Sequence, residues 1–112
     1  EIIYGLRNFI GNANKFSKDT IYINLKSDNE ITEIIIEDDG SGFPKDVLPK
    51  IGEPYLRSSD MMKKSKSGLG LGLFIGKTLL EKNFASINCR NSQTRTGAEV
   101  VIKWRNKDLF NI

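Results

Sequence analysis

Two glycine clusters constrain this chain more than any other feature. Asp38 to Gly42 (DDGSG) closes a β-branched run, and Gly68 to Leu73 (GLGLGL) precedes apolar residues at helical spacing. Glycine costs roughly 0.5 to 1 kcal/mol inside a regular element and buries no side chain, so packing alone does not explain alternating glycines. A phosphate-binding loop at a helix N-terminus, where unpaired N–H groups favour an anion, explains the second cluster better than a flexible hinge.

The first glycine cluster has two interpretations. Taken alone, a strand end followed by a turn is the simpler one, because Asp and Gly are common turn residues. In the functional interpretation, Asp38 accepts a hydrogen bond from a ligand amine, while Gly40 and Gly42 let the backbone approach a flat ring. Adenine is a ring with such an amine.

The N-terminal segment has the pattern of an amphipathic helix with an unusual polar face. Its apolar residues form one stripe, and Asn8, Asn12 and Lys15 project from the opposite face. A solvated surface would account for a single Asn in a helix, but two at i and i+4 need a reason, since Asn is a mediocre helix former. Two amide oxygens beside a lysine suit magnesium and a phosphate oxygen.

Composition and charge indicate one modest globular domain. The 112 residues are 38% hydrophobic and 28% charged, and no apolar run approaches the roughly 20 residues that span a bilayer. No secretory signal is recognised. The net charge of +3 is too small to favour nucleic acid, and basic residues gather instead just before the second glycine cluster. The single Cys89, in a strand-like run, is expected to be a buried structural thiol.

The order of predicted elements favours a two-layer α/β sandwich, with the helices covering one face of a sheet. Residues 53–67 lack periodicity, and we interpret them as a lid over a nucleotide. A short helix is expected after Pro44. The other expected elements are a helix ending near 16–18, strands at 20–26 and 31–37, a helix at about 72–82, and strands at 86–91 and 98–104.

These motifs together resemble the catalytic and ATP-binding domain of bacterial sensor histidine kinases, in the group that includes gyrase, heat-shock protein 90 and MutL-type ATPases. The resemblance covers residues 1–104, and the whole chain, 1–112, is expected to be this one domain. It is carried in order by Asn8 to Ser17, Asp38 to Gly42, Glu53-Pro54-Tyr55, Gly68 to Gly72 and Thr96-Gly97-Ala98. It implies a Bergerat-type fold with a mixed, mostly antiparallel sheet. Residues 52–55 and 70–81 look most like redox-responsive proteobacterial sensor kinases.

The resemblance also implies roles for individual residues toward ATP and magnesium. Asn12 would bind the metal with help from Asn8, and Lys15 would touch phosphate; these three are the expected catalytic residues. Asp38 would accept from the adenine amine, and the Thr96 hydroxyl would help at that end. The other expected ATP contacts are Phe16, Gly40, Gly42, Tyr55, Arg57, Gly68, Gly70, Leu71 and Gly72.

Position 8 separates branches of this group. The true ATPases carry a glutamate there, four residues before the metal-binding asparagine, where it can activate water. An amide cannot take a proton near neutral pH, so Asn8 favours a kinase over an ATPase or ATP-gated clamp. A serine kinase that regulates a sigma factor and a nucleotide-sensing degenerate kinase remain alternatives.

The chain has no histidine, so the phosphoacceptor of a histidine kinase would lie elsewhere in a longer parent. The resemblance then implies partners: dimerisation and phosphoacceptor helices of that parent, which would be a homodimer, and a response regulator. No nucleic acid or membrane contact is expected for this domain. It would be cytoplasmic, in a parent that the inner membrane can anchor.

Overall fold

The computed structural model describes residues 1–46, 48–51 and 69–110. Its four strands begin and end within one residue of the predicted bounds. The elements in chain order are α1 (Ile2–Phe16), β1 (Ile21–Ser27), β2 (Ile31–Asp38), the 3-10 turn η1 (Leu48–Lys50), α3 (Leu69–Lys82), β3 (Ser86–Asn91), β4 (Ala98–Arg105) and α4 (Asn106–Leu109).

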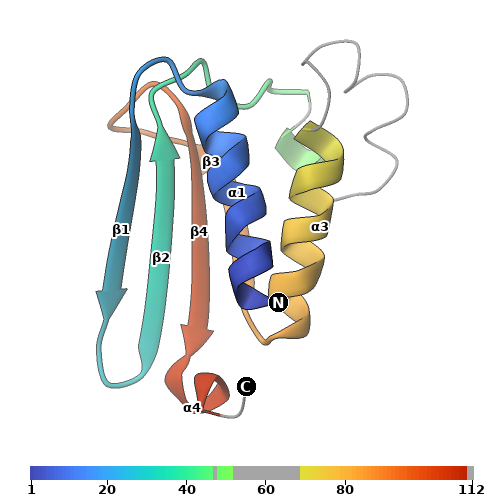
Figure 1. Ribbon diagram of the computed structural model, residues 1–112. Helices are drawn as coiled ribbons and strands as arrows, with labels where there is room; N and C mark the ends of the chain where they lie inside the picture. Colours follow the sequence, from blue (N-terminus) through green and yellow to red (C-terminus); the bar gives the residue numbers. More distant parts are fainter. Residues whose placement is uncertain (47, 52–68, 111–112) are drawn as a thin grey trace.

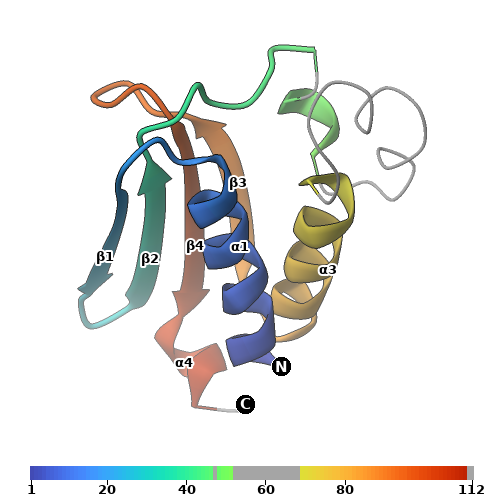
Figure 2. The same cartoon turned by 45° about the horizontal axis from the view of Figure 1, so that its top comes forward.

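The strands form one sheet in the order β1-β2-β4-β3, and all three pairings are antiparallel. Both long helices lie on the same face of this sheet (Figures 1 and 2). The predicted two-layer α/β sandwich is therefore confirmed. Among the described strands no pair is parallel, so the expected mixed character of the sheet is not seen there.

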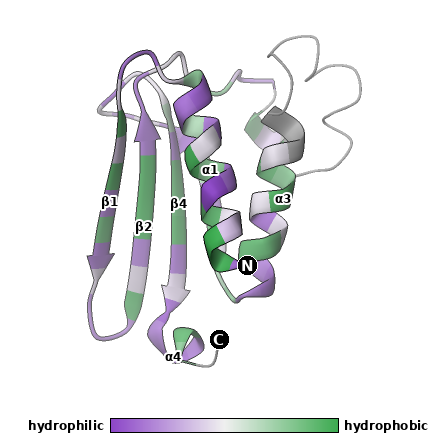
Figure 3. Ribbon diagram, viewed as in Figure 1, coloured by the Kyte–Doolittle hydropathy of each residue, from purple (hydrophilic) through white to green (hydrophobic). Residues whose placement is uncertain are grey.

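The core lies between the sheet and the two helices. Pairing across the strands puts Ile36, Val100 and Ile102 on the helix-facing side, where all three are buried. Around α1, hydrophobic residues alternate with polar ones (Figure 3). On the same face, Ile23 and Leu25 of β1 remain 51% and 69% exposed, because α1 contacts β2 and α3 contacts β3. The sheet is thus covered unevenly, with β1 left open.

Two glycines let the helices approach closely. A Cβ atom on Gly76 would stand 2.8 Å from the Phe9 ring, and one on Gly5 would stand 2.9 Å from Cγ of Leu80. Both distances are shorter than packed carbon atoms allow. The small residues on facing sides of α1 and α3 therefore set how near the two helices lie.

Three local features differ from the sequence prediction. Helix α3 begins at Leu69 rather than near residue 72, and the short helix expected after Pro44 is the single turn η1, whose Leu48 N–H donates to the Pro44 carbonyl at 3.0 Å. Helix α4 was not predicted; it is held by tertiary bonds such as that from the Asn106 N–H to the Glu30 carbonyl at 2.8 Å. None of the described helices is both long and apolar enough to cross a membrane.

Candidate functional site

The polar face of α1 forms one wall of a cavity of about 220 Å³ at the start of α3. The structure thus brings together Asn8, Asn12, Lys15 and Gly72, four predicted site residues from two distant motifs. The full lining is Arg7, Asn8, Gly11, Asn12, Lys15 and Gly72.

The side chain of Asn8 is held in one orientation within this cavity. Its Nδ2 donates to the Tyr4 carbonyl one turn earlier, at 2.9 Å. Its Oδ1 faces α3, because a Cβ atom on Gly72 would lie 3.9 Å from that oxygen. An amide whose nitrogen is already engaged presents its oxygen, the atom that a hard cation prefers.

Gly72, in the first turn of α3, completes the cavity lining. Because the first four N–H groups of an α-helix have no intrahelical acceptor, the N–H groups from Leu69 to Gly72 can donate to a ligand. Gly70, which was predicted to precede the helix, lies inside this turn together with Gly72, and this corrects the predicted helix start. The two glycines can adopt helical backbone in this turn because its N–H groups need no hydrogen-bond acceptor within the helix.

Asp38 ends strand β2 as a buried carboxylate, with only 4% of its surface exposed. Its Oδ1 accepts from the Gly40 N–H at 2.8 Å and from the Ala98 N–H at 3.4 Å. A Cβ atom on Gly97 would overlap this carboxylate and the Asp38 carbonyl. These contacts occupy one carboxylate oxygen and fix the direction of the other.

Contacts within the chain explain the two glycines that follow. A Cβ atom on Gly40 would overlap the Phe16 carbonyl, so the loop closes on the end of α1. Gly42 has a φ of 85°, which favours glycine, and a Cβ there would lie 2.7 Å from Oδ1 of Asn91. The same Asn91 accepts from the Phe43 N–H at 2.7 Å and donates to its carbonyl at 3.1 Å. Contact of these glycines with adenine stays a prediction.

Asp39, next to Asp38, has a structural role. Its carboxylate accepts from the N–H groups of Lys18, Asp19 and Thr20, which follow α1, at 2.8 to 3.2 Å. These bonds, above all that from Asp19, lower the pKa of Asp39 below its ordinary value. The Thr96 hydroxyl donates to the Asp39 carbonyl at 3.2 Å, so Thr96 is tied to the same loop.

The predicted residues thus gather at two places along α1. Phe16, at the end of α1, lies against the loop that holds Asp38, and the Lys15 ammonium lies 5.8 Å from the centre of the Phe16 ring. Asn8, Asn12 and Lys15 line the cavity beside α3. Leu71 belongs to the first turn of α3. Tyr55, Arg57, Gly68 and the lid predicted at 53–67 lie outside the described residues.

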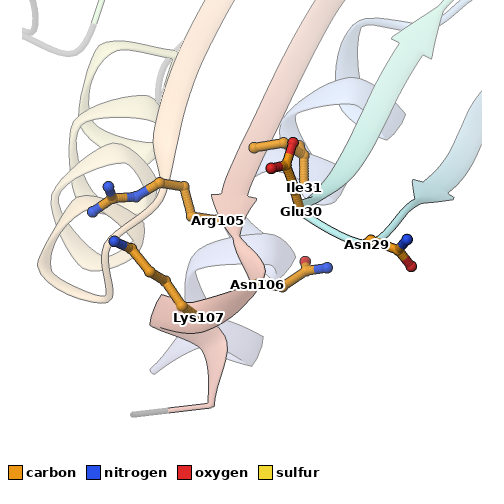
Figure 4. A pocket seen from close by; sticks show the side chains of 6 residues that line it. All are labelled: Asn29, Glu30, Ile31, Arg105, Asn106 and Lys107. Atoms are coloured by element: carbon orange, nitrogen blue, oxygen red, sulfur yellow. The ribbon is translucent and has the colours of Figure 1, made fainter.

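A second cavity, of about 420 Å³, lies at the opposite end of the sheet, where α4 meets the turn between β1 and β2 (Figures 1 and 4). Asn106 fastens this junction: its Nδ2 donates to the Asp28 carbonyl and its Oδ1 accepts from the Thr32 hydroxyl, both at 2.7 Å. Arg105 is paired with Asp108 at 3.0 Å. None of the predicted site residues lines this cavity.

Sequence reasoning missed three residues at the two places along α1. Arg7 and Gly11 line the cavity, and their spacing from Asn8, Asn12 and Lys15 on one helix face could have indicated them. Asn91, which holds the Phe43 backbone, had no such signal because 48 residues separate the partners.

Comparisons with known proteins show the family and the fold of the chain. Residues 2–108 match the family of histidine kinase-, DNA gyrase B-, and HSP90-like ATPases. The sensor histidine kinase RegB of Cereibacter sphaeroides is 36% identical over 93% of this chain, and the sensor protein SrrB of Staphylococcus aureus is 32% identical over 88%. The chain spans 26% of RegB and 17% of SrrB, so it corresponds to a minor part of these relatives.

Solved structures show the same fold at lower identity. The mycobacterial sensor histidine kinase MprB superposes with a TM-score of 0.70 at 24% identity, over 91% of this chain and 70% of that one. Full-length ShkA, in complex with AMPPNP, gives 0.69 at 24% identity, over 90% of this chain and 20% of that one.

Proposed function

Because the chain belongs to the family of histidine kinase-, DNA gyrase B-, and HSP90-like ATPases, we propose that residues 1–112 are the ATP-binding domain of a sensor histidine kinase and hold Mg-ATP for phosphoryl transfer. The cavity that joins Asn8, Asn12 and Lys15 to Gly72 is the observation that carries this proposal. It combines amide oxygens for a cation with a lysine and helix N–H groups for phosphates.

In this proposal the nucleotide extends along α1. Adenine lies at the Asp38 loop, where Oδ2 of Asp38 accepts from the exocyclic amine, since Oδ1 already accepts from Gly40 and Ala98. Phe16 and Thr96 border the same end. The phosphates lie between Lys15 and the first turn of α3, with Asn12 and Asn8 supplying magnesium ligands. The neighbour ShkA, whose structure contains the ATP analogue AMPPNP, supports this use of the fold.

The side chain at position 8 favours phosphoryl transfer over hydrolysis. Its amide nitrogen donates to Tyr4, and its oxygen cannot take a proton from water near neutral pH. The γ-phosphoryl group is thereby kept for another acceptor. Since the chain contains no histidine, that acceptor is a histidine on another segment of the parent protein, from which a response regulator then receives the phosphoryl group.

The uncovered part of the sheet supports a docking role for parent segments. Ile23 and Leu25 of β1 are exposed on the side that the helices cover elsewhere, and Ile3 of α1 is 72% exposed. Such apolar side chains suit the dimerisation and phosphoacceptor helices of the parent. The domain then works on the cytoplasmic side, whether or not the parent is anchored in a membrane.

Calorimetry on residues 1–112 tests the nucleotide assignment. We expect ATP to bind only weakly without magnesium and far better with it, and GTP to bind more weakly than ATP, because guanine presents a carbonyl where adenine has its amine. Equal affinities for ATP and GTP would contradict the adenine assignment.

A phosphate-release assay separates kinase from ATPase. We expect slow background turnover from residues 1–112 and autophosphorylation in the intact parent protein. Rapid phosphate release by this domain alone would instead favour the ATPase branch.

A further inference from the structure

Arg7 is a charged residue in the cavity lining, and none of the predicted motifs includes it. It is exposed and lines the cavity beside Asn8. Among the described residues it forms no ion pair. Helix α1 contains no acidic residue, and its only charged side chains are Arg7 and Lys15. The cavity lining therefore carries two cations and no anion, and the N-terminus of α3 adds partial positive charge.

The position of Arg7 along α1 distinguishes it from Lys15. The loop that follows Asp38 approaches the end of α1 at Gly40, next to the Phe16 carbonyl. Arg7 lies nine residues before Phe16, or about 13 Å along the helix axis, whereas Lys15 is adjacent to Phe16. Of the α1 residues that line the cavity, Arg7 is therefore the farthest from the adenine end. It stands beside Asn8, whose oxygen faces Gly72.

Gly11 leaves the surface open between the two cations. It lies one turn after Arg7 and one turn before Lys15, in the middle of α1, where glycine costs roughly 0.5 to 1 kcal/mol relative to alanine. Packing does not require this glycine, because, apart from the neighbouring residues and the α1 backbone itself, no described atom lies within 4 Å of where its Cβ would be. Without a side chain at position 11, the Arg7 guanidinium can reach a ligand that lies over the helix.

We propose that Arg7 binds the terminal phosphate of ATP and so makes this site prefer ATP to ADP. The inference rests on the proposed nucleotide function and extends it to a residue that determines which nucleotide state is held. A guanidinium can donate two parallel hydrogen bonds to one phosphate, which a neutral side chain of similar length cannot reproduce.

Nucleotide affinities of Arg7→Gln test this inference, with Lys26→Gln as a control that removes one positive charge from exposed β1, outside the cavity. Calorimetry with Mg-ATP and Mg-ADP is run on the wild type and both variants. We expect Arg7→Gln to weaken ATP binding about tenfold and ADP binding less than twofold, as for loss of a charged hydrogen bond. Lys26→Gln should change neither affinity.

Arg7→Lys tests whether the effect of Arg7→Gln comes from the lost guanidinium or from a general disturbance of the site. It keeps the charge but loses the planar donor pair, so its ATP affinity should fall between those of the wild type and Arg7→Gln. Equal weakening of ATP and ADP by Arg7→Gln, or no weakening of ATP, would overturn the inference while leaving the proposed function intact. Failure of the wild type to bind either nucleotide would overturn both.

Discussion

The amide oxygen of Asn8 lies 3.9 Å from the point where a Cβ atom on Gly72 would stand. This approach joins two motifs that are 64 residues apart in the chain (72 minus 8). It also places the Asn8 oxygen beside the N–H groups that begin α3. A nucleotide bound here would touch both helices at once.

The dependence of ATP affinity on magnesium should require Asn12. We expect Asn12→Ala to lower ATP affinity at least about tenfold in magnesium, because an amide oxygen is lost from the metal, and to change little in EDTA. Asn14→Ala is a matched control, since Asn14 lies on the same helix, is exposed and does not line the cavity. Calorimetry with and without magnesium measures both variants, and equal losses would argue against a metal role for Asn12.

Substitutions of the neighbouring Asp38 and Asp39 should have different effects. The first should weaken ATP binding, and the second should lower the stability of the fold. Asp38→Asn keeps an oxygen for Gly40 and Ala98 but loses an acceptor for adenine, so ATP affinity should fall while the melting temperature changes little. Asp39→Asn should lower the melting temperature, because the Asp39 carboxylate accepts from three backbone N–H groups, and should leave ATP affinity nearly unchanged.

The Asp39 effect has a definite pH dependence. Because the pKa of Asp39 is lowered in the folded chain, its stabilising contribution is complete above its ordinary value of 3.8 and is lost as pH falls through the folded value. The difference in melting temperature between wild type and Asp39→Asn should therefore shrink as pH is lowered from 5 toward 3. A difference that grows in acid would rule out this role.

Gly76 and Gly11 should respond oppositely to alanine. Gly76→Ala places a methyl group 2.8 Å from the Phe9 ring and should destabilise the fold by about 1 to 3 kcal/mol through overpacking. Gly11→Ala meets no described atom within 4 Å outside its neighbours and the α1 backbone, and it should stabilise the fold by about 0.5 to 1 kcal/mol. Urea unfolding of both variants measures the contrast, and destabilisation by Gly11→Ala would contradict the structure.

The sequence predicted the elements because their patterns are local. Alternation and β-branched runs located each strand within a residue, and helical spacing put Asn8, Asn12 and Lys15 on one face of α1. The start of α3 was misplaced because glycine propensity argues against helix, whereas the first turn tolerates glycine. Two sets of hydrogen bonds depend on tertiary contacts, which no local pattern encodes. One joins the Asn91 side chain to the Phe43 backbone, and in the other the Asp39 carboxylate accepts from the N–H groups of residues 18–20.

Phe84 occupies a position that favours glycine. It has a φ of 74° just after α3, where its N–H donates to the Glu81 carbonyl and the Ala85 N–H donates to that of Leu80, as in a Schellman motif. The left-handed conformation costs a side-chain residue about 1 to 2 kcal/mol, and Phe84 is 56% exposed. Phe84→Gly should therefore raise stability to urea by up to about 1 kcal/mol; a clear loss would indicate that the ring packs usefully.

The thiol of Cys89 should make stability fall above pH 9. Burial raises the pKa of Cys89 from 9.0 to about 11, an effect that the Lys77 cation partly offsets. Since the folded pKa is the higher one, the contribution is complete below pH 9 and is lost as pH rises toward 11, at about 1.4 kcal/mol per pH unit. Cys89→Ala removes this component, so its unfolding free energy should decline less steeply over the same range. Urea unfolding at intervals from pH 8 to 11 compares the two proteins, and parallel curves would show that the thiol ionises equally well in the folded chain.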